Sequence, residues 1–428
     1  MPALVQPSPQ GIATTRPGRR GYSNEIEALA QCANFQFFSQ LSHESRVADL
    51  CAILSLREAS VIRSSIRRYA VAFGRPLEVV GRYRPRHLRA DLVAGLTVAV
   101  LAIPQCIAYA SIAGLPPTYG LYSAAVAVMV GALWGSSRFL STGPTNAISI
   151  LVLSILTPLA ALGSVEFMMA ASLMAVMVGV LCIGFGFAGL GVLVNFASRA
   201  VLLGFTTGAG ILIAAGQLKN LLRLDVPRSP HLWRTMSGVA SELDQTHLAS
   251  LILGVSTVLV ILVLDGYFRR LPGSLVALVG SGIVVAVAGA DRLGFDVVGA
   301  VPRSVPQVTA FSFSWVFSND LLGPLAMGSL AVAALGLVEA VSIAREIARQ
   351  SGERLDVNQE LVGQGMANIA AGLFSGYACS GSFTRSAVNF QSGARTQMSS
   401  VLCGLLILAG IFAFGPLAAY LPRAALAG

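Results

Sequence analysis

Two short polar stretches decide the fold: STGPTN at residues 141–146 and CSGSFTRS at residues 379–386. Each lies within apolar sequence, and each has the residue types that begin a helix. A helix N-terminus carries unpaired N–H donors and about half a positive charge. Two such N-termini that face each other inside a membrane would form an anion site, and this is the central prediction from the sequence.

The residues within these stretches predict where each helix begins. In the first stretch, Thr142 or Gly143 can cap the helix while Pro144 takes the first helical position, where its missing N–H costs nothing. In the second stretch, Ser380 or Ser382 can cap a short helix. Both helices are expected to start near the middle of the bilayer.

The composition is that of a polytopic membrane protein. The 428 residues are 55% apolar and 11% charged, and their mean hydropathy is +0.72, whereas soluble domains carry about 25% charged residues. Apolar stretches close to the roughly 20 residues needed to cross the hydrocarbon recur after residue 91. Membrane strands would give alternating segments of about ten residues instead, so the predicted fold class is an all-α polytopic membrane protein.

The distribution of charge predicts orientation rather than a nucleic-acid partner. Much of the net charge of +9 lies in the N-terminal stretch and in short loops. By the positive-inside rule these loops, and the N-terminus, are cytoplasmic. The loop at about 219–247 disagrees, because its arginines and Lys219 would lie outside. The expected location is the bacterial inner membrane.

Residues 1–86 are predicted to form a separate cytoplasmic region. The segment Pro2 to Arg20 has the composition of a disordered tail. Glu25–Ile66 shows helical spacing and could rest on the membrane or on a partner as one or two amphipathic helices. A segment with no fixed role is the alternative. No apolar core of a cleavable signal peptide precedes it.

The first span, about Leu92–Ala113, carries two polar candidates for an anion site. Pro104 is expected to break the helix at mid-membrane. Gln105 follows it, and Tyr109 lies one turn later on the same face. The alternative is that Gln105 only ties two helices together.

Two charged residues lie deep in the apolar sequence. Glu339 lies within the span at about Leu321–Ile343, and a carboxylate there costs about 3 kcal/mol unless it is paired, hydrated or protonated. A proton-coupling role is therefore predicted, with an ion pair to Arg385 as the alternative. Arg385 lies one turn into the second short helix, where it either adds positive charge to the anion site or reaches to the membrane surface.

Other patterns indicate packing and exclude several kinds of site. Gly204 and Gly208 have the spacing that lets membrane helices pack closely. The six cysteines have no paired spacing, the four histidines lie outside the spans, and the chain has no phosphate-binding GxxxxGK[ST] loop. We therefore expect no metal, no cofactor and no enzymatic activity. The last apolar stretch, about Pro416–Gly428, is predicted to be a further span.

Several motifs, in this order, resemble the SulP anion transporters, relatives of human solute carrier family 26. They lie at 103–122, 141–145, 204–222 and 381–389, and the resemblance covers about 80–428. It implies two inverted repeats of seven helices, here at 87–290 and 291–428, with a core and a gate domain and with half-helices as the third and tenth helices. It also implies a homodimer.

The resemblance places the anion-site residues on matching positions of this sequence. The substrate-binding candidates are Gln105, Tyr109, Thr145, Phe383, Thr384 and Arg385. The family's acidic residue for proton coupling falls on Glu339. The family's last two gate helices and its STAS domain are not found before residue 428, so the second repeat is expected to be incomplete.

The expected function is secondary transport of a small inorganic anion, with sulfate and proton symport by an elevator movement favoured. The nearest alternatives are a bicarbonate or dicarboxylate transporter or exchanger, and an uncoupled anion channel. A different alternative is a truncated, non-transporting membrane fragment that binds a partner through its N-terminal region.

Overall fold

The computed structural model describes a set of ranges that begins after the N-terminal region. These are residues 74–191, 199–226, 232–267, 273–289, 294–299, 303–311, 313–318, 320–415 and 420–427. All of them belong to one of two units, Arg68–Gly428. The predicted tail and amphipathic helices within residues 1–66 lie outside the described residues.

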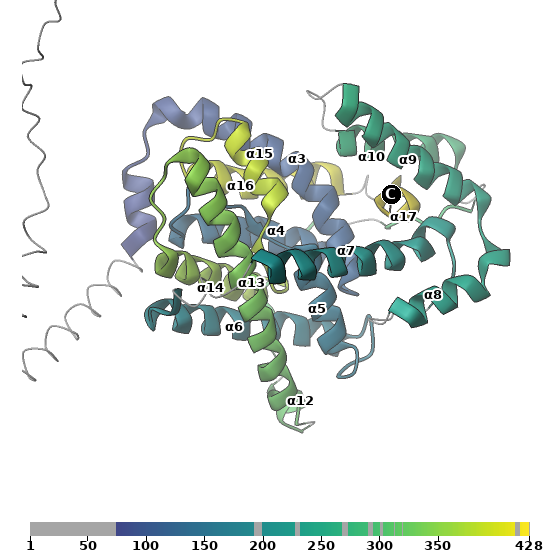
Figure 1. Cartoon of the computed structure of the whole chain (residues 1–428), viewed down its shortest axis with the longest axis horizontal. Helices are drawn as coiled ribbons and strands as arrows, with labels where there is room; N and C mark the ends of the chain where they lie inside the picture. Colours follow the sequence, from purple (N-terminus) through teal and green to yellow (C-terminus); the bar gives the residue numbers. More distant parts are fainter. Residues whose placement is uncertain are drawn as a thin grey trace, which may run out of the picture. The chain divides into compact units, whose positions relative to one another are not determined.

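The described helices of the first half follow the predicted apolar spans, except that α8 lies in the stretch 219–247 that was predicted as a loop (Figure 1). They are α3 (Leu88–Ile112), α4 (Pro117–Trp134), α5 (Asn146–Leu156), α6 (Val165–Phe187), α7 (Arg199–Leu222), α8 (Leu232–Ser241), α9 (Leu248–Tyr267) and α10 (Gly273–Ala288). The short strand β1 (Thr142–Gly143) precedes α5.

The second half repeats this order. Its described elements are α12 (Phe313–Ser318), α13 (Leu322–Ser351), α14 (Val357–Leu373), β2 (Ser380–Gly381), α15 (Phe383–Gln391), α16 (Met398–Phe414) and α17 (Arg423–Ala427). In both halves, two long helices lead to a two-residue strand, a short helix and then another apolar helix. The chain is therefore organised as two repeats of the same pattern.

The lengths of the helices separate full spans from half-helices. Four helical segments of the described residues are long and apolar enough to cross a membrane: Pro85–Ile112, Pro117–Trp134, Val165–Phe187 and Leu322–Ser351. By contrast, α5 has 11 residues and α15 has 9, which at a rise of 1.5 Å per residue is about half of the roughly 30 Å hydrocarbon core. Both are half-helices, as predicted.

The two polar stretches meet in an antiparallel pair of strands. Thr142 of β1 lies opposite Gly381 of β2, and Gly143 lies opposite Ser380. One further backbone bond extends the pairing, from the Ser382 N–H to the Ser141 carbonyl at 3.0 Å. Because the strands run in opposite directions, α5 and α15 leave the pairing in opposite directions.

Helices of each repeat pack against helices of the other repeat. In the first repeat, α4 leads to β1 and packs against α16, which follows the second half-helix. In the second repeat, α14 leads to β2 and packs against α6, which follows the first half-helix. In the same way α3 contacts α15 while α13 contacts α5. The all-α inverted-repeat architecture predicted from the sequence is confirmed.

Close helix contact occurs at a different glycine pair from the one that the sequence suggested. A Cβ on Gly179 of α6 would lie 2.5 Å from the Gly365 carbonyl oxygen, and a Cβ on Gly365 of α14 would lie 2.6 Å from the Gly179 oxygen. The two backbones therefore touch, which only glycine permits. Among the described atoms, a Cβ on Gly204 or Gly208 would meet none within 4 Å.

The predicted break at Pro104 is absent. Helix α3 continues through Pro104, which lies buried near its middle. Proline removes one backbone hydrogen bond, but α4 and α16 both pack against α3 and keep the helix continuous. Gln105 and Tyr109 therefore stay on one continuous helical face.

Of the two predicted helix N-caps, the one on α15 is confirmed and the one on α5 is wrong. Ser382 caps α15, and its hydroxyl accepts from the Arg385 N–H, as one of the two alternatives predicts. Helix α5 instead begins at Asn146, with Thr145 as its N-cap and no capping bond from that side chain. The reason is that Thr145 is itself extended, with φ −131° and ψ 158°, so the helix cannot include Pro144 and begins only after Thr145.

The span predicted at about Pro416–Gly428 is not a single helix in its described part. Pro422 forms an isolated bridge with Val297, and the helix that follows covers only Arg423–Ala427. In the described part of 416–428, an extended segment thus precedes a short helix. Proline at 422 fits this arrangement because it is tolerated just before a helix begins but not within one.

Candidate functional site

Arg385 occupies the centre of the predicted site. It is the third residue of α15, and only 2% of the residue is exposed. Its Nη2 donates to the Pro144 carbonyl oxygen at 2.9 Å, and its Nη1 lies 3.9 Å from Sγ of Cys106. No carboxylate forms an ion pair with it among the described residues. A buried guanidinium that no carboxylate contacts directly favours an anion as its partner.

Gly143 makes room for this guanidinium. A Cβ at this position would lie 3.0 Å from Nη2 of Arg385 and 3.7 Å from its Cζ. Any larger residue would therefore press on the arginine. The glycine of the first stretch and the arginine of the second are thus parts of one site.

Glu339 of α13 contacts the start of the other half-helix. The Thr145 hydroxyl donates to Oε2 of Glu339 at 3.3 Å. Glu339 is half-buried, and the predicted alternative of an ion pair with Arg385 is not among the ion pairs of the described residues. The carboxylate is therefore tied to α5 by a neutral hydroxyl, which leaves it able to gain a proton.

Gln105 and Tyr109 lie on α3, which packs against both half-helices. Both residues are half-buried, and Oε1 of Gln105 is buried without a hydrogen-bond partner among the described residues. Cys106, next to Gln105, is the α3 residue whose side chain meets Arg385. Residues 105–109 thus belong to the helix that packs against both half-helices, and Oε1 of Gln105 is an unused acceptor on it.

Phe383 and Thr384 lie differently from Arg385. Phe383 is 57% exposed and Thr384 is also exposed, whereas Arg385 is buried. The first turn of α15 therefore directs Arg385 inward and leaves the other two predicted residues on the surface of the described chain. Arg385 and Thr145 each bond a residue of the opposite repeat, whereas no side-chain hydrogen bond among the described residues joins Phe383 or Thr384 to the site.

A cavity of about 300 Å³ lies beside the start of α5. Asn146, Gln217 and Leu221 are among its lining residues, so it lies between α5 and α7. Oδ1 of Asn146 is buried and has no hydrogen-bond partner in the part of the chain that the structure describes. This volume is at the lower end of that of small-molecule sites and leaves space for a small anion and its water.

A polar stripe on α14, which the sequence analysis missed, supports both strands. Glu360, Gln364 and Asn368 are spaced by four residues and are all buried. Gln364 donates to the Thr142 hydroxyl at 2.8 Å, and Asn368 bonds both the N–H and the carbonyl of Cys379 at 2.8 and 3.0 Å. One face of α14 therefore fixes β1 and β2 together. The i, i+4, i+8 spacing in an apolar helix was the available signal.

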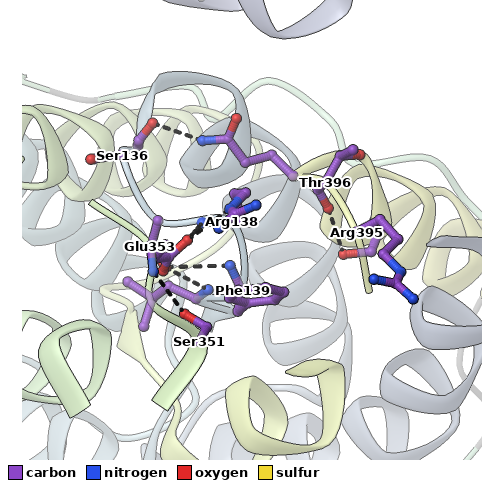
Figure 2. Close-up of polar contacts among 12 residues, drawn as sticks. Ser136, Arg138, Phe139, Ser351, Glu353, Arg395 and Thr396 are labelled. Atoms are coloured by element: carbon purple, nitrogen blue, oxygen red, sulfur yellow. Dashed lines mark hydrogen bonds and ion pairs between the residues drawn. The ribbon is translucent and has the colours of Figure 1, made fainter. Parts of the chain in front are cut away.

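The loop after α4 is held by two acidic residues. Oε2 of Glu360 accepts from the Ser136 and Ser137 N–H groups at 2.8 Å each. Figure 2 shows Glu353 beside Arg138, whose backbone N–H and Nε both donate to it at 3.1 Å. These bonds fix the segment that leads into β1. A third carboxylate, Asp91 of α3, holds the loop after α15 in the same way by accepting from Thr396.

Comparison with known sequences places this arrangement in a family. The sequence model of the sulfate permease family matches residues 88–428. The chain belongs to this family. The predicted membership is therefore confirmed.

The family's curated members include transporters from plants and bacteria. Probable sulfate transporter 4.2 of Arabidopsis thaliana is 35% identical over 350 residues, which are 80% of this chain and 51% of that protein. A probable sulfate transporter of Mycobacterium tuberculosis is 34% identical over 345 residues, which are 80% of this chain and 60% of that protein. The chain spans about half to three fifths of the length of these relatives. The family and these relatives are transporters rather than enzymes, as the sequence predicts.

Solved structures share the fold. The transmembrane domain of a cyanobacterial bicarbonate transporter, BicA, aligns with a TM-score of 0.74 and 27% identity over 81% of this chain and 88% of that domain. The murine Slc26a9 anion transporter aligns with a TM-score of 0.75 and 23% identity over 84% of this chain and 62% of that one. The chain is therefore an integral, multi-pass membrane protein with the inverted-repeat fold.

Proposed function

We propose that this sulfate permease chain carries the anion site of a secondary transporter for small inorganic anions. The observation that supports this most strongly is Arg385, buried between the starts of two half-helices without a carboxylate partner in the described chain. The positive ends of α5 and α15 add to its charge. An anion bound there would supply the direct ion-pair partner that Arg385 lacks among the described residues.

Sulfate is the proposed substrate, and a proton is the proposed coupling ion. The curated relatives quoted above are named sulfate transporters. Sulfate is a dianion, so a site that holds both Arg385 and an ionised Glu339 has no net side-chain charge to offer it. A proton on Glu339 restores one positive charge, and sulfate and a proton then bind together. Bicarbonate remains the second candidate because BicA is named a bicarbonate transporter.

The proposed movement is an elevator motion. The β1–β2 pairing and the polar face of α14 join the two half-helices, so the anion site would move as one body. The helices α7, α9 and α17 contact one another and α7 lies against α5, so α7 would be the surface that the site slides along. The repeats at 87–290 and 291–428 would supply the core and gate domains.

The remaining proposals concern the setting of the transporter. We propose a homodimer in a bacterial inner membrane with a cytoplasmic N-terminus. The arginines of the loops after α4 and α15, Arg138 and Arg395, would then face the cytoplasm, in accord with the positive-inside rule. A non-transporting fragment stays the competing hypothesis for this chain alone.

The decisive test is uptake of labelled sulfate into proteoliposomes that contain this chain, with and without an inward proton gradient. Bicarbonate, chloride and succinate serve as competitors. Saturable uptake that the gradient stimulates would support proton–sulfate symport, and linear uptake would indicate a channel. A folded preparation that binds sulfate but does not take it up would assign the site and contradict transport by this chain alone.

A further inference from the structure

A second polar cavity lies at the end of the chain's first membrane helix, away from the strand pair. It has a volume of about 120 Å³ and lies between the helical residues 74–81 and the loops after α4 and α15. Arg75, Arg82 and Tyr83 line one side of it, and Arg138 and Thr396 line the other. Both of the latter residues are labelled in Figure 2.

Two hydrogen-bond donors at this cavity have no acceptor. Nε of Arg75 and the hydroxyl of Tyr83 are buried, and neither has a partner among the described residues. Buried donors of this kind are uncommon because the lost bond to water is not replaced. A ligand with several acceptor oxygens close together would satisfy both of them.

The arginines at the cavity favour an anionic ligand. Three of them line it with one acidic residue, Glu78, which accepts from Arg75 at 3.0 Å and pairs with Arg82 at 2.6 Å. Two more carboxylates lie outside the lining: Glu353 pairs with Arg138 at 3.1 Å, and Asp91 accepts from Thr396. Since the charges are balanced, the case for an anion rests on the free Nε of Arg75 and on the preference of arginine for phosphate oxygens.

The surrounding surface shows why the ligand would be a lipid. On the same helical turn as these arginines, Leu77 is 81% exposed and Val80 is 56% exposed. The first turns of α3 expose Leu92, Val93 and Leu96 as well. Of the two arginines, Arg75 is turned toward the protein, whereas the side chain of Arg82 is 79% exposed. Exposed apolar residues beside basic ones are typical of a segment lying in the membrane interface. Basic pockets beside membrane helices bind lipid headgroups there.

We propose that this cavity binds the phosphate of an anionic phospholipid of the phosphatidylglycerol type. The phosphate oxygens accept from Arg75 Nε and Tyr83 Oη, and the acyl chains run along the exposed apolar residues of the 74–81 helix and α3. The loop after α4 supplies Arg138 to the same headgroup, while the Thr396 hydroxyl stays bonded to Asp91. The lipid thereby links the helix before α3 to the loop that leads into β1.

The test is thermal unfolding of the purified full chain in neutral detergent, titrated with phosphatidylglycerol, phosphatidylcholine or inorganic phosphate. We expect phosphatidylglycerol at saturation to raise Tm by about 2–4 °C, with a much smaller shift from the other two. An equal shift from phosphatidylcholine would overturn the headgroup assignment. An equal shift from inorganic phosphate at the same concentration would overturn the lipid assignment and leave a free-anion site.

Variants locate the binding. We expect Arg75→Gln to weaken phosphatidylglycerol about tenfold and Tyr83→Phe about threefold, since each removes one donor. Arg86→Gln is the matched control, because Arg86 is exposed in the same stretch and does not line the cavity. If Arg86→Gln weakens binding as much as Arg75→Gln, the attraction is general charge rather than this cavity. If Arg75→Gln unfolds, Tyr83→Phe serves as the test, because it keeps the ring and all charges. Unchanged phosphatidylglycerol binding in that variant would then overturn the assignment.

Discussion

The two half-helices have the same place in their repeats but differ in chemistry. Arg385 is the third residue of α15, and the third residue of α5 is Ile148, which is fully buried. The N-cap of α15, Ser382, forms a capping hydrogen bond with its own helix. The N-cap of α5, Thr145, forms none, and its hydroxyl instead donates to Glu339. Both charged groups of the site, Glu339 and Arg385, therefore come from the second repeat.

This difference suggests a division of labour within a symmetric scaffold. The repeated architecture supplies two helix N-termini at one point, and it does so equally from both sides. Under the proposed function, the second repeat would add the charges that select an anion and couple it to a proton. The first repeat adds neutral groups and the space that Gly143 leaves. Changes in α13 and α15 should therefore alter charge recognition, and changes around β1 and α5 should alter its geometry.

The largest effect is expected from Arg385→Ala. We expect sulfate affinity to fall about a hundredfold, because the variant removes a buried charge and its charge-assisted bonds. Arg385→Lys should recover part of the affinity, since it keeps the charge but not the planar fork. Isothermal titration in detergent at fixed ionic strength measures both. Ile148→Val, at the corresponding position of α5, is the control and should bind normally; unchanged affinity in the alanine variant would remove Arg385 from the site.

Glu339→Gln separates coupling from binding. We expect uptake driven by an inward proton gradient to fall about tenfold, while sulfate exchange between the two sides of the vesicle persists, because glutamine mimics the protonated acid but cannot release the proton. In the unaltered protein, uptake should rise as the outside is made more acidic, since the protonated form binds the dianion. Gradient-driven uptake that survives the substitution would refute the coupling role.

Gly143→Ala tests whether the first repeat sets the geometry of Arg385. The added methyl would lie 3.0 Å from Nη2, so the guanidinium must shift away from the Pro144 carbonyl. We expect sulfate affinity to fall about fivefold, because a shifted guanidinium would lose part of the strength of one charged hydrogen bond. Gly208→Ala is a matched control, because a Cβ there meets no described atom within 4 Å. Equal effects from the two would show that the alanine acts on the helix backbone in general.

The smallest effect is expected at the caps. Ser382→Ala removes the bond to the Arg385 N–H and should lower the free energy of unfolding by about 1 kcal/mol. Thr145→Val loses no capping bond, so its effect on stability should be smaller. Denaturation followed by tryptophan fluorescence in detergent compares the two. A larger loss in the Thr145 variant would mean that its bond to Glu339, rather than the cap at Ser382, stabilises the pair of half-helices.

The sequence predicts those features that depend on the residues of one segment alone. Polar residues and proline or serine inside apolar sequence marked both half-helices, and the depth of Arg385 and Glu339 marked them as exceptional. Composition and span length were enough to predict the all-helical membrane fold. These features depend on local residue types and on the bilayer, both of which can be read along the chain.

Contacts between distant segments could not be read in this way. The start of α5 was misplaced because Thr145 is extended and bonds Glu339, and nothing near Thr145 encodes that partner. The glycine spacing at Gly204 is typical of close packing, yet the observed close approach joins Gly179 and Gly365 from different helices. The stripe of Glu360, Gln364 and Asn368 has a readable spacing, but its targets lie in other loops.

The pairing of the two polar stretches also bears on how the protein is made. The backbone N–H of Ser141 bonds the hydroxyl of Ser386, 245 residues later in the chain. At about 5–20 residues per second, the ribosome needs about 12–50 s to reach that partner. During this interval the first half-helix resides in or near the membrane without the groups that complete it. Delays in translation between the two repeats should therefore expose this protein to degradation more than delays elsewhere.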